Sequence, residues 1–379
     1  MDRRLPSIPS LMAGPLHDLG ARLGLGPTGL GLAVAGILWV VLVILAGAAG
    51  GLDELLALHF IAGHVRILVA LPLVLACEGV AEAALGPFVR GLVASHIVRG
   101  ASATALQREC DRFNRLTSSR LAEGLLLIVA ALPVWIGTDV AALGDTAMRP
   151  SGSGSEMPLV GYWYWLVCLP LFRFVLLRAV FRLAVWYFFL WRLSRMELNL
   201  VPTHPDRLGG LRILAEVQTG FILMTSAVSS VVSAAIAEEI AVRGGHVQEY
   251  YGTIIVTLLI CAAVFIAPLY IFAGQLWRVR LRGRAEYADL AAGYVGAFDT
   301  KWLRGGARED ELLGNADLQS LADLGNSVRV IDEMMLAPVT WDTVKHYAAA
   351  ALGPMFPLLL FEIPLQEIAG RVLEKLLGG

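Results

Sequence analysis

The chain has 379 residues, of which 57% are hydrophobic and 16% charged, and its mean hydropathy is +0.67. These values lie outside the range of ordinary soluble domains and predict a membrane protein. The formal net charge of −2 provides no overall basic field, so nucleic acid is excluded as an expected partner.

Six apolar segments are each long enough to cross a bilayer core, which requires roughly 20 helical residues. They cover approximately 28–49, 66–87, 121–142, 158–181, 216–238 and 252–275. A weaker seventh segment, 346–364, contains three prolines, so both a full span and a re-entrant hairpin remain open for it. The sequence therefore predicts an all-α, polytopic helical membrane protein with six to seven transmembrane helices.

Three regions follow from this pattern. Residues 1–275 are expected to form the transmembrane bundle, and 276–345 a small helical cytoplasmic segment broken by glycines. Residues 346–379 comprise the seventh segment and an amphipathic tail, in which Ile368, Val372, Leu373 and Leu376 share one face.

The basic residues predict the orientation. If the N-terminus is cytoplasmic, the inner side collects groups of three, six, five and nine Arg or Lys, whereas the outer loops hold only Arg149 and Arg243. This positive-inside bias is strong. Only three of the basic residues are lysine, which together with abundant Ala, Gly and Leu suggests a GC-rich bacterial genome. We expect a bacterial inner-membrane protein in contact with the lipid bilayer.

Charged residues within the apolar segments are the first candidate site. Two carboxylates lie four residues apart in the second span, at about the same depth as the arginines of the fourth span. These residues are Glu78, Glu82, Arg173, Arg178 and Arg182. A charge inside a bilayer is usually paired or lines a water-filled path. Two other interpretations stay open: a salt bridge that fixes helix packing, or arginines at the inner interface beneath a belt of Trp186, Tyr187 and Trp191.

Hydroxyl side chains form a second candidate. They recur every three or four residues on the fifth and sixth spans, at Ser226, Ser229, Ser230, Ser233, Thr253 and Thr257. Such stripes either allow helices to pack closely or line a narrow hydrated pore.

The segment LVPTHPDRLGGLRIL, residues 200–214, is the third candidate and is expected to be the cytoplasmic turn between spans four and five. Its prolines disfavour helix, so the fourth helix should end near Asn199, with Asp206 capping the next one. Glycine N–H groups beside arginines also suit a phosphate or a lipid headgroup, which makes His204, Asp206, Arg207, Gly209, Gly210 and Arg212 anion candidates.

Enzymatic and metal chemistry are not expected, and an integral-membrane enzyme that uses Glu78 and a histidine is kept only as a third alternative. The histidines lack metal-ligand spacing, the four cysteines have the pattern of buried thiols, and no nucleotide-binding or nucleophile motif is present. We therefore expect no metal and no cofactor.

The segments 162–214 and 318–336 resemble a group of uncharacterised bacterial multi-pass inner-membrane proteins with a PTHPDR-GGL loop. This resemblance supports a bacterial membrane protein and implies no activity. From the residues, the leading hypothesis is a channel or transporter for a small ion or solute. The alternative is a membrane scaffold or signalling protein that docks a cytoplasmic partner or anionic lipid. A homo-oligomer is compatible with both.

Overall fold

The computed structural model describes residues 8–136, 158–304 and 315–361, and every regular element in these ranges is helical, which confirms the all-α class for them. The α-helices are α1 (Pro15–Arg22), α2 (Pro27–Ala49), α3 (Leu52–Leu55), α4 (Ile61–Val65), α5 (Leu71–Ala94), α6 (Ala101–Thr117), α7 (Arg120–Ile136), α8 (Pro158–Trp163), α9 (Leu169–Ser194), α10 (Ile213–Thr219), α11 (Ile222–Arg243), α12 (Tyr251–Phe265), α13 (Ala273–Phe298), α14 (Ala316–Asp332) and α15 (Trp341–Leu352). Tighter or wider helical turns join them: η1 (Leu58–Phe60), η2 (Arg66–Ala70), η3 (Tyr164–Cys168), η4 (Val247–Tyr250), η5 (Ala267–Phe272), η6 (Asp299–Arg304) and η8 (Gly353–Phe361).

Four helical runs among the described residues are long and apolar enough to cross a membrane: Pro27–Ala49, Leu58–Ala94, Ile213–Arg243 and Val247–Arg304. Helices α6 and α7 meet at a 42° bend and make a fifth if they count as one span. The predicted spans 158–181 and 346–364 fall on α8–α9 and on α15–η8, which are not among these runs. Six to seven spans are therefore not confirmed, and part of the predicted span 121–142, as well as the amphipathic tail, lies outside the described residues.

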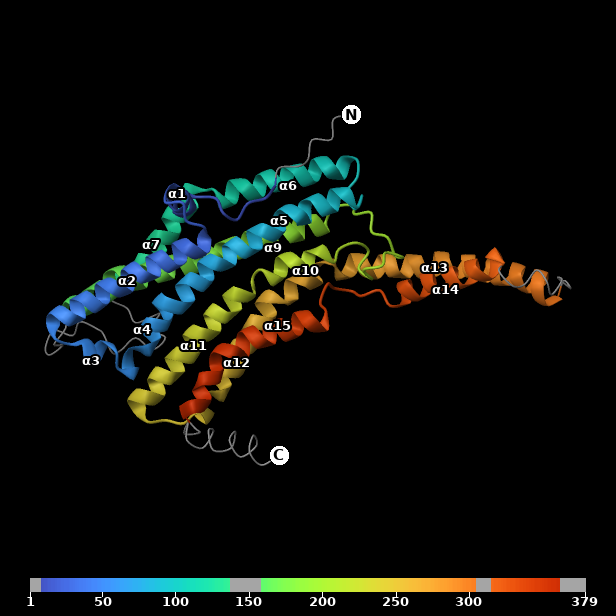
Figure 1. The fold of residues 1–379 in the computed structure, drawn as a ribbon. Helices are drawn as coiled ribbons and strands as arrows, with labels where there is room; N and C mark the ends of the chain where they lie inside the picture. Colours follow the sequence, from blue (N-terminus) through green and yellow to red (C-terminus); the bar gives the residue numbers. More distant parts are fainter. Residues whose placement is uncertain (1–7, 137–157, 305–314, 362–379) are drawn as a thin grey trace, which may run out of the picture.

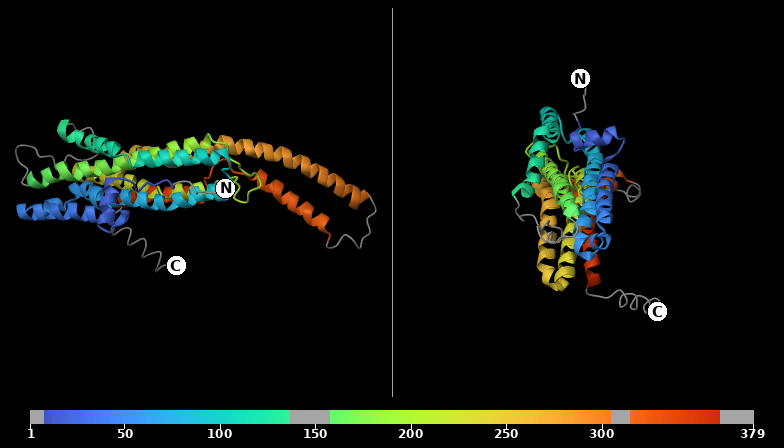
Figure 2. Two further views of the ribbon diagram at one scale, coloured as in Figure 1. Left: turned by 90° about the horizontal axis from the view of Figure 1, so that it is seen from above. Right: turned by 90° about the vertical axis from the view of Figure 1, so that its left-hand side faces the viewer.

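The main helices lie side by side in an elongated bundle (Figures 1 and 2). Helix α5 is central, because it packs against α2, α9, α10 and α11. Helix α9 also packs against α6 and α7, while α15 and η8 cover α11. The four cysteines are free and buried, as predicted.

The ends of α2 illustrate how the sequence sets local structure. Pro27 occupies the first turn, where its missing N–H is not needed, and Gly50 ends the helix in the left-handed conformation with φ 71°. Between them the helix is apolar all round, so residues that face outward remain apolar. Leu32, Ile37 and Ile44 are each about 60% exposed.

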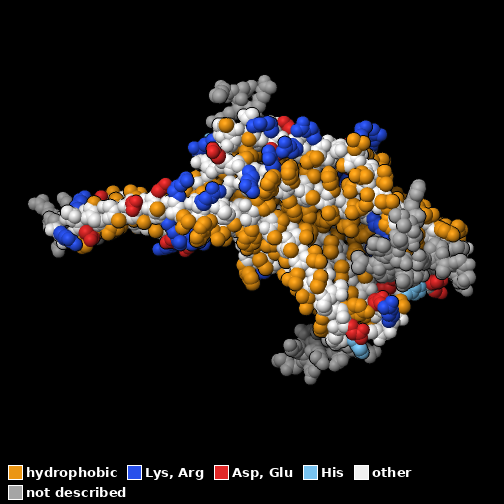
Figure 3. All heavy atoms as spheres, turned by 180° about the vertical axis from the view of Figure 1, so that it is seen from behind, with side chains coloured by type: hydrophobic (Ala, Val, Ile, Leu, Met, Phe, Trp, Pro, Cys, Tyr) orange, Lys and Arg blue, Asp and Glu red, His pale blue; other side chains and the backbone are white. Residues whose placement is uncertain are grey.

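The bundle surface is correspondingly apolar. Helix α12 exposes Ile255, Val256, Leu259 and Ile260, and hydrophobic side chains cover much of the face seen in Figure 3. Lys and Arg gather along one edge of that face and on the projecting helices. A soluble monomer rarely exposes a contiguous apolar surface of this extent.

Helices α13 and α14 form a hairpin that projects beyond the bundle (Figures 1 and 2). Ion pairs close it at both ends: Arg284 Nε lies 2.7 Å from Asp332 Oδ1, and Lys301 Nζ lies 2.5 Å from Asp317 Oδ2. The Lys301 ammonium and the Trp302 N–H, 3.1 Å away, hold the pKa of the Asp317 carboxyl below its ordinary value. At its base, Gly283 packs so closely on Pro202 that a Cβ added there would lie 2.6 Å from Pro202 Cβ.

Candidate functional site

Five charged or titratable side chains from four helices meet inside the bundle. We call them the charge cluster: His17 of α1, Glu78 of α5, Glu123 of α7, and Arg178 and Arg182 of α9. The two arginines lie four residues apart and therefore share one face of α9. All five residues are buried, Arg178 completely.

Glu78 is the centre of the charge cluster. Arg178 Nη1 donates to both of its carboxylate oxygens, at 2.8 and 2.7 Å, and Arg182 Nη1 donates to Oε2 at 2.8 Å. His17 Nε2 lies 2.8 Å from the same Oε2. One carboxylate thus joins three cationic or titratable groups, and charge-assisted bonds of this kind are the strongest hydrogen bonds in proteins.

Glu123 balances the second arginine charge. Its Oε1 accepts a hydrogen bond from Arg178 Nε at 3.0 Å and lies 3.5 Å from Arg182 Nη2. Two carboxylates therefore offset two guanidinium groups. One buried donor, Arg178 Nη2, has no hydrogen-bond partner among the described residues, so the cluster retains one strong donor for a small polar or anionic species.

Residues 8–22, which we call the N-terminal segment, cover the charge cluster. Arg182 Nη2 donates to the Ala13 carbonyl, and Glu82 Oε2 accepts a hydrogen bond from the Leu11 N–H. Gly14 has φ 110°, and a Cβ placed on it would lie 2.9 Å from Glu123 Cδ. Only glycine allows the chain to approach the Glu123 carboxylate this closely.

The structure separates the five predicted charge candidates into three environments. Glu78, Arg178 and Arg182 belong to the charge cluster, and Glu82 holds the N-terminal segment. Arg173 instead lines a cavity on another face of α9. The two arginines of the cluster are buried among protein side chains, and Trp186 is also fully buried, where its indole donates to Gln218 at 3.2 Å.

The hydroxyl candidates lie in two separate places. Ser226 and Ser229 on α11 donate to the carbonyl oxygens of Ala350 and Ala351 on α15, and Ser230 donates to Ser226 O within its own helix. Ser233 is buried on the same helix. On α12, Thr257 donates to Thr253 O at 2.8 Å, and Thr253 is exposed. Two of the serines thus bond across a helix contact, and pore lining by this set remains a prediction.

Helix α9 ends at Ser194, earlier than the expected end near Asn199, so residues 195–212 connect it to α10, and we call 200–212 the junction loop. The Asp206 carboxylate accepts hydrogen bonds from the N–H groups of Leu208, Gly210 and Arg212, at 2.8, 3.1 and 3.2 Å. His204 Nδ1 lies 2.7 Å from Asp206 Oδ1. A side chain of the protein itself therefore occupies the position near Gly210 where an external anion was expected.

The junction loop also holds the hairpin. Arg207, at φ 59°, accepts a backbone bond from Met335 N at 2.8 Å, and its Nη2 lies 2.9 Å from Glu333 Oε2. A Cβ on Gly209, which has φ 64°, would lie 3.1 Å from Leu200 Cβ and 3.6 Å from Met334 Cε. These contacts fix the segment after α14 to the loop before α10.

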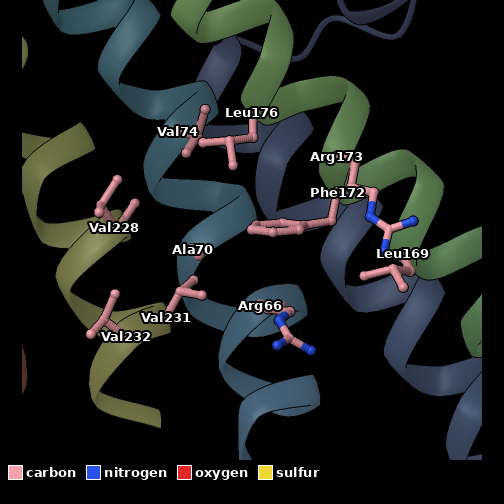
Figure 4. Close-up of a pocket in the computed structure, with 11 residues that line it drawn as sticks. Arg66, Ala70, Val74, Leu169, Phe172, Arg173, Leu176, Val228, Val231 and Val232 are labelled. Atoms are coloured by element: carbon pink, nitrogen blue, oxygen red, sulfur yellow. The ribbon is translucent and has the colours of Figure 1, made fainter. Parts of the chain in front are cut away.

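Sequence reasoning missed two residues of the charge cluster, His17 and Glu123, and also Arg66, which lines the same cavity as Arg173 (Figure 4). Glu123 stands near the start of an otherwise apolar run, LAEGLLLIVAAL, and a lone carboxylate in that position is the signal that would have found it. Arg66 likewise begins the apolar run of the second span. No comparable signal marks His17.

Neither the family models, nor the curated proteins, nor the solved structures with which the chain was compared include a match. Within the described residues, no group of His, Cys, Asp and Glu side chains is arranged to hold a metal ion.

Proposed function

We propose that this chain is a multi-pass protein of a bacterial inner membrane, with six to seven spans and a cytoplasmic N-terminus, that moves a small ion or solute across the bilayer. The observation that carries the proposal is the buried charge cluster, held among helices whose outer surfaces are apolar. In this proposal the described arrangement is the closed state.

The exposed surface supports membrane placement. In the most apolar stretch of α2 only 22% is buried, and in the most apolar stretch of Val247–Arg304 only 17% is buried. Each square ångström of apolar surface left in water costs about 25 cal/mol, so burial of this surface in lipid would stabilise the protein. The basic residues gathered at one edge suit the cytoplasmic boundary of that solvent.

The composition of the charge cluster supports transport. Ionisable residues within a membrane bundle are costly to bury and characteristically mark ion or proton pathways. Glu78 is shared by His17, Arg178 and Arg182, so a proton on its carboxylate, or an anion arriving at the arginines, would break several bonds at once. A carboxylate and an imidazole in contact are also the groups that proton relays use.

The N-terminal segment supports assignment of a closed state. It joins Ala13 to Arg182, Leu11 to Glu82 and His17 to Glu78, and so covers the cluster at the side where a cytoplasmic N-terminus lies. Displacement of this short segment would expose the cluster without disturbing the packing of the long helices.

Reconstituted flux tests the proposal. The full chain is placed in liposomes, and H⁺, K⁺ and Cl⁻ fluxes are measured for the wild type, Gly14→Ala and Gly24→Ala. The added methyl of Gly14→Ala presses on Glu123 and should lift the N-terminal segment, so its flux should exceed that of the wild type.

Gly24→Ala is the matched control, because Gly24 also has a positive φ, 68°, but no atom within 4 Å of an added Cβ. Both substitutions strain the backbone, and only one reaches the cluster. Absence of flux for all three ions in folded wild type and in Gly14→Ala would sink the transport proposal. Equal flux in Gly14→Ala and Gly24→Ala would show that the N-terminal segment does not control transport.

A second candidate is a membrane scaffold, which the α13–α14 hairpin favours. The hairpin projects from the bundle, begins with exposed arginines near residues 278–284, and is held by the junction loop. A basic segment at this position suits an anionic membrane surface or an acidic partner. Vesicle co-sedimentation of wild type and Arg282→Gln, compared at low and high anionic lipid content, distinguishes the scaffold from a pure transporter.

A further inference from the structure

The hairpin formed by α13 and α14 has almost no core of its own. Its buried residues, Leu276 and Gly283 of α13 and Ile331 of α14, all lie in or next to the bundle (Figures 1 and 2). Further out, half-buried residues recur at intervals of three and four, as in a coiled coil: Tyr287, Ala291, Tyr294 and Phe298 of α13, and Leu321, Leu324 and Val328 of α14. Short helices with so little burial are marginal in water, so a further contact would stabilise the hairpin.

Each helix of the hairpin also carries a second apolar face, and this one is exposed. Its residues, which we call the outer seam, again recur at intervals of three and four: Leu281, Ala285, Ala288, Ala292 and Val295 of α13, and Leu318, Ala322 and Gly325 of α14. Leu281, Val295 and Leu318 are 47%, 44% and 52% exposed. A Cβ added to Gly325 would have no atom within 4 Å. The outer seam is therefore open along its length.

The two parts of the outer seam lie on one side of the hairpin. On each helix the seam is turned by about 100°, in the same sense, from the half-buried residues. Because the two helices are antiparallel, the same sense of turn brings both parts to the same side. Arg284 and Asp332 lie on the seam side of their helices, and their ion pair of 2.7 Å is the contact that this arrangement requires.

Lipid is not the natural cover for the outer seam. The arginines at 278–284, where α13 leaves the bundle, suit the cytoplasmic membrane surface, so the rest of the hairpin stands beyond that surface. Its other faces carry charged side chains such as Glu286 and Asp323. An apolar face in water is stabilised when another protein surface covers it.

We propose that the outer seam binds the outer seam of a second copy of this chain, so that two hairpins form a four-helix bundle on the cytoplasmic side of the membrane. Two copies in one membrane project their hairpins in the same direction and to the same height. A two-fold axis along the hairpins then places α13 of one protomer against α14 of its partner. The small residues Ala288, Ala292 and Gly325 in the middle of the seam allow the helix axes to approach to about 8 Å.

Charge complementarity favours this occupant. Asp289 borders the α13 part of the outer seam, and Arg329 continues the α14 part by one more interval of four; both are exposed. Since Arg284 lies opposite Asp332, Asp289 is level with residues 327–328, less than one helical turn from Arg329. The two-fold axis therefore brings Asp289 of each protomer beside the partner's Arg329, at two symmetry-related positions.

The inference uses the membrane placement of the bundle and is independent of transport. A dimer that shows no flux leaves the interface intact. Flux from a protein that is monomeric at every dilution leaves the transport proposal intact and overturns this one.

Subunit counting in lipid tests the interface. The full chain, with one fluorophore on an N-terminal tag, is placed in phosphatidylcholine liposomes, and photobleaching steps are counted as the lipid is diluted. The wild type should be a dimer that dissociates on dilution. Ala288→Glu places like charges in the seam and should raise the dissociation constant at least tenfold.

Ala297→Glu is the matched control for Ala288→Glu. The two alanines are both exposed on α13 and lie nine residues apart, which puts them on opposite sides of the helix. Ala297→Glu should therefore leave the dissociation constant within about twofold of the wild type. Equal weakening by both substitutions, or a dimer that Ala288→Glu leaves intact, would place the contact elsewhere and overturn the proposal.

A charge swap distinguishes the interface from a loss of folding. Asp289→Arg or Arg329→Asp alone should weaken the dimer about threefold to tenfold, because each sets like charges against one another in both symmetry-related positions. The double variant restores opposite charges and should recover the wild-type dissociation constant. Additive weakening in the double variant contradicts the proposed pairing.

Disulfide cross-linking tests which helices meet. By the same levels, Ala292 lies opposite the partner's Gly325, and the four native cysteines are buried. Chains with Ala292→Cys and chains with Gly325→Cys are mixed, reconstituted and oxidised with copper phenanthroline. The mixture should cross-link faster than either variant alone. Cross-linking no faster in the mixture, or a wild type that is monomeric at every dilution, overturns the proposal.

Discussion

Replacement of Glu78 by glutamine tests the charge cluster most directly. The substitution preserves the shape of the side chain and removes one negative charge. In the wild type, that carboxylate accepts three hydrogen bonds from Arg178 and Arg182, none longer than 2.8 Å, and contacts His17. After the change, Glu123 alone faces two buried guanidinium groups, and the new amide N–H₂ points toward donors.

The expected loss follows from this imbalance. Glu78 is only 3% exposed, so water does not replace the missing charge. Removal of one partner of a buried ion pair costs about 3–5 kcal/mol, because the remaining charge is left uncompensated. The free energy of unfolding of Glu78→Gln should therefore fall by about 3–5 kcal/mol.

Equilibrium unfolding in bicelles measures this loss, with Glu286→Gln on the exposed surface of α13 as the control. That control should change stability by less than about 0.5 kcal/mol. The double variant Glu78→Gln, Arg182→Gln restores the charge balance and should recover part of the loss, with a coupling energy of about 1 kcal/mol or more. Near-wild-type stability of Glu78→Gln, or strictly additive losses in the double variant, would refute the reasoning.

Three further predictions concern the junction loop and the hairpin. Asp206→Ala removes the acceptor of three N–H groups, which costs about 1–3 kcal/mol for each that stays buried. Amide exchange across residues 200–212 should therefore accelerate. The control Asp289→Ala, on the exposed surface of α13, should leave this exchange unchanged. Gly283→Ala should destabilise the protein because the added Cβ meets Pro202. Gly293→Ala, with open space around it, should stabilise α13 by up to about 1 kcal/mol. A change in thermal unfolding of the same sign in both variants would contradict the packing argument. Because the folded-state pKa of Asp317 is lowered, its stabilising contribution is complete above the ordinary value of 3.8 and is lost as the pH falls through the lower folded value. Trp302 fluorescence should follow this loss, and Lys301→Met should move the midpoint upward; an unmoved midpoint would remove Lys301 as the cause.

Long apolar segments were predictable because a continuous run of apolar residues is visible in the sequence without knowledge of its packing partners. The predicted span 28–49 differs from α2 by a single residue at its start. The boundary near Asn199 was less accurate, since prolines exclude helix but do not specify where the preceding helix stops; α9 ends at Ser194. The number of candidate spans also depends on residues outside the described ranges.

Residues of the charge cluster could be predicted to lie together only where they share one face of the same helix. Spacing of four residues placed Arg178 and Arg182 together, and their depth matched Glu78. Arg173 precedes Arg178 by five residues, which turns it by about 140° to another side of α9, where η2 and α11 form the cavity. His17 and Glu123 joined the cluster through tertiary packing, which sequence spacing does not encode.

The junction loop shows the same limit. Its glycines and arginines predicted N–H groups that accept an anion, and the N–H groups of Leu208, Gly210 and Arg212 donate to the Asp206 carboxylate. Nothing in the spacing showed that Asp206 would fold back to supply it. Arg207, with its positive φ of 59°, accepts a hydrogen bond from Met335 in the segment after α14, more than a hundred residues further along the chain.

The run Val247–Arg304 has a mechanical consequence. Its 58 residues, at 1.5 Å each, extend about 87 Å, far more than a bilayer core, with only short η turns interrupting the α-helix. A force on α13 is therefore carried along a stiff rod as far as η5, where α13 meets α12. The compliant point of this rod is η5, where Pro268 lacks the N–H for a helical hydrogen bond, so bending stress concentrates at Ala267–Phe272.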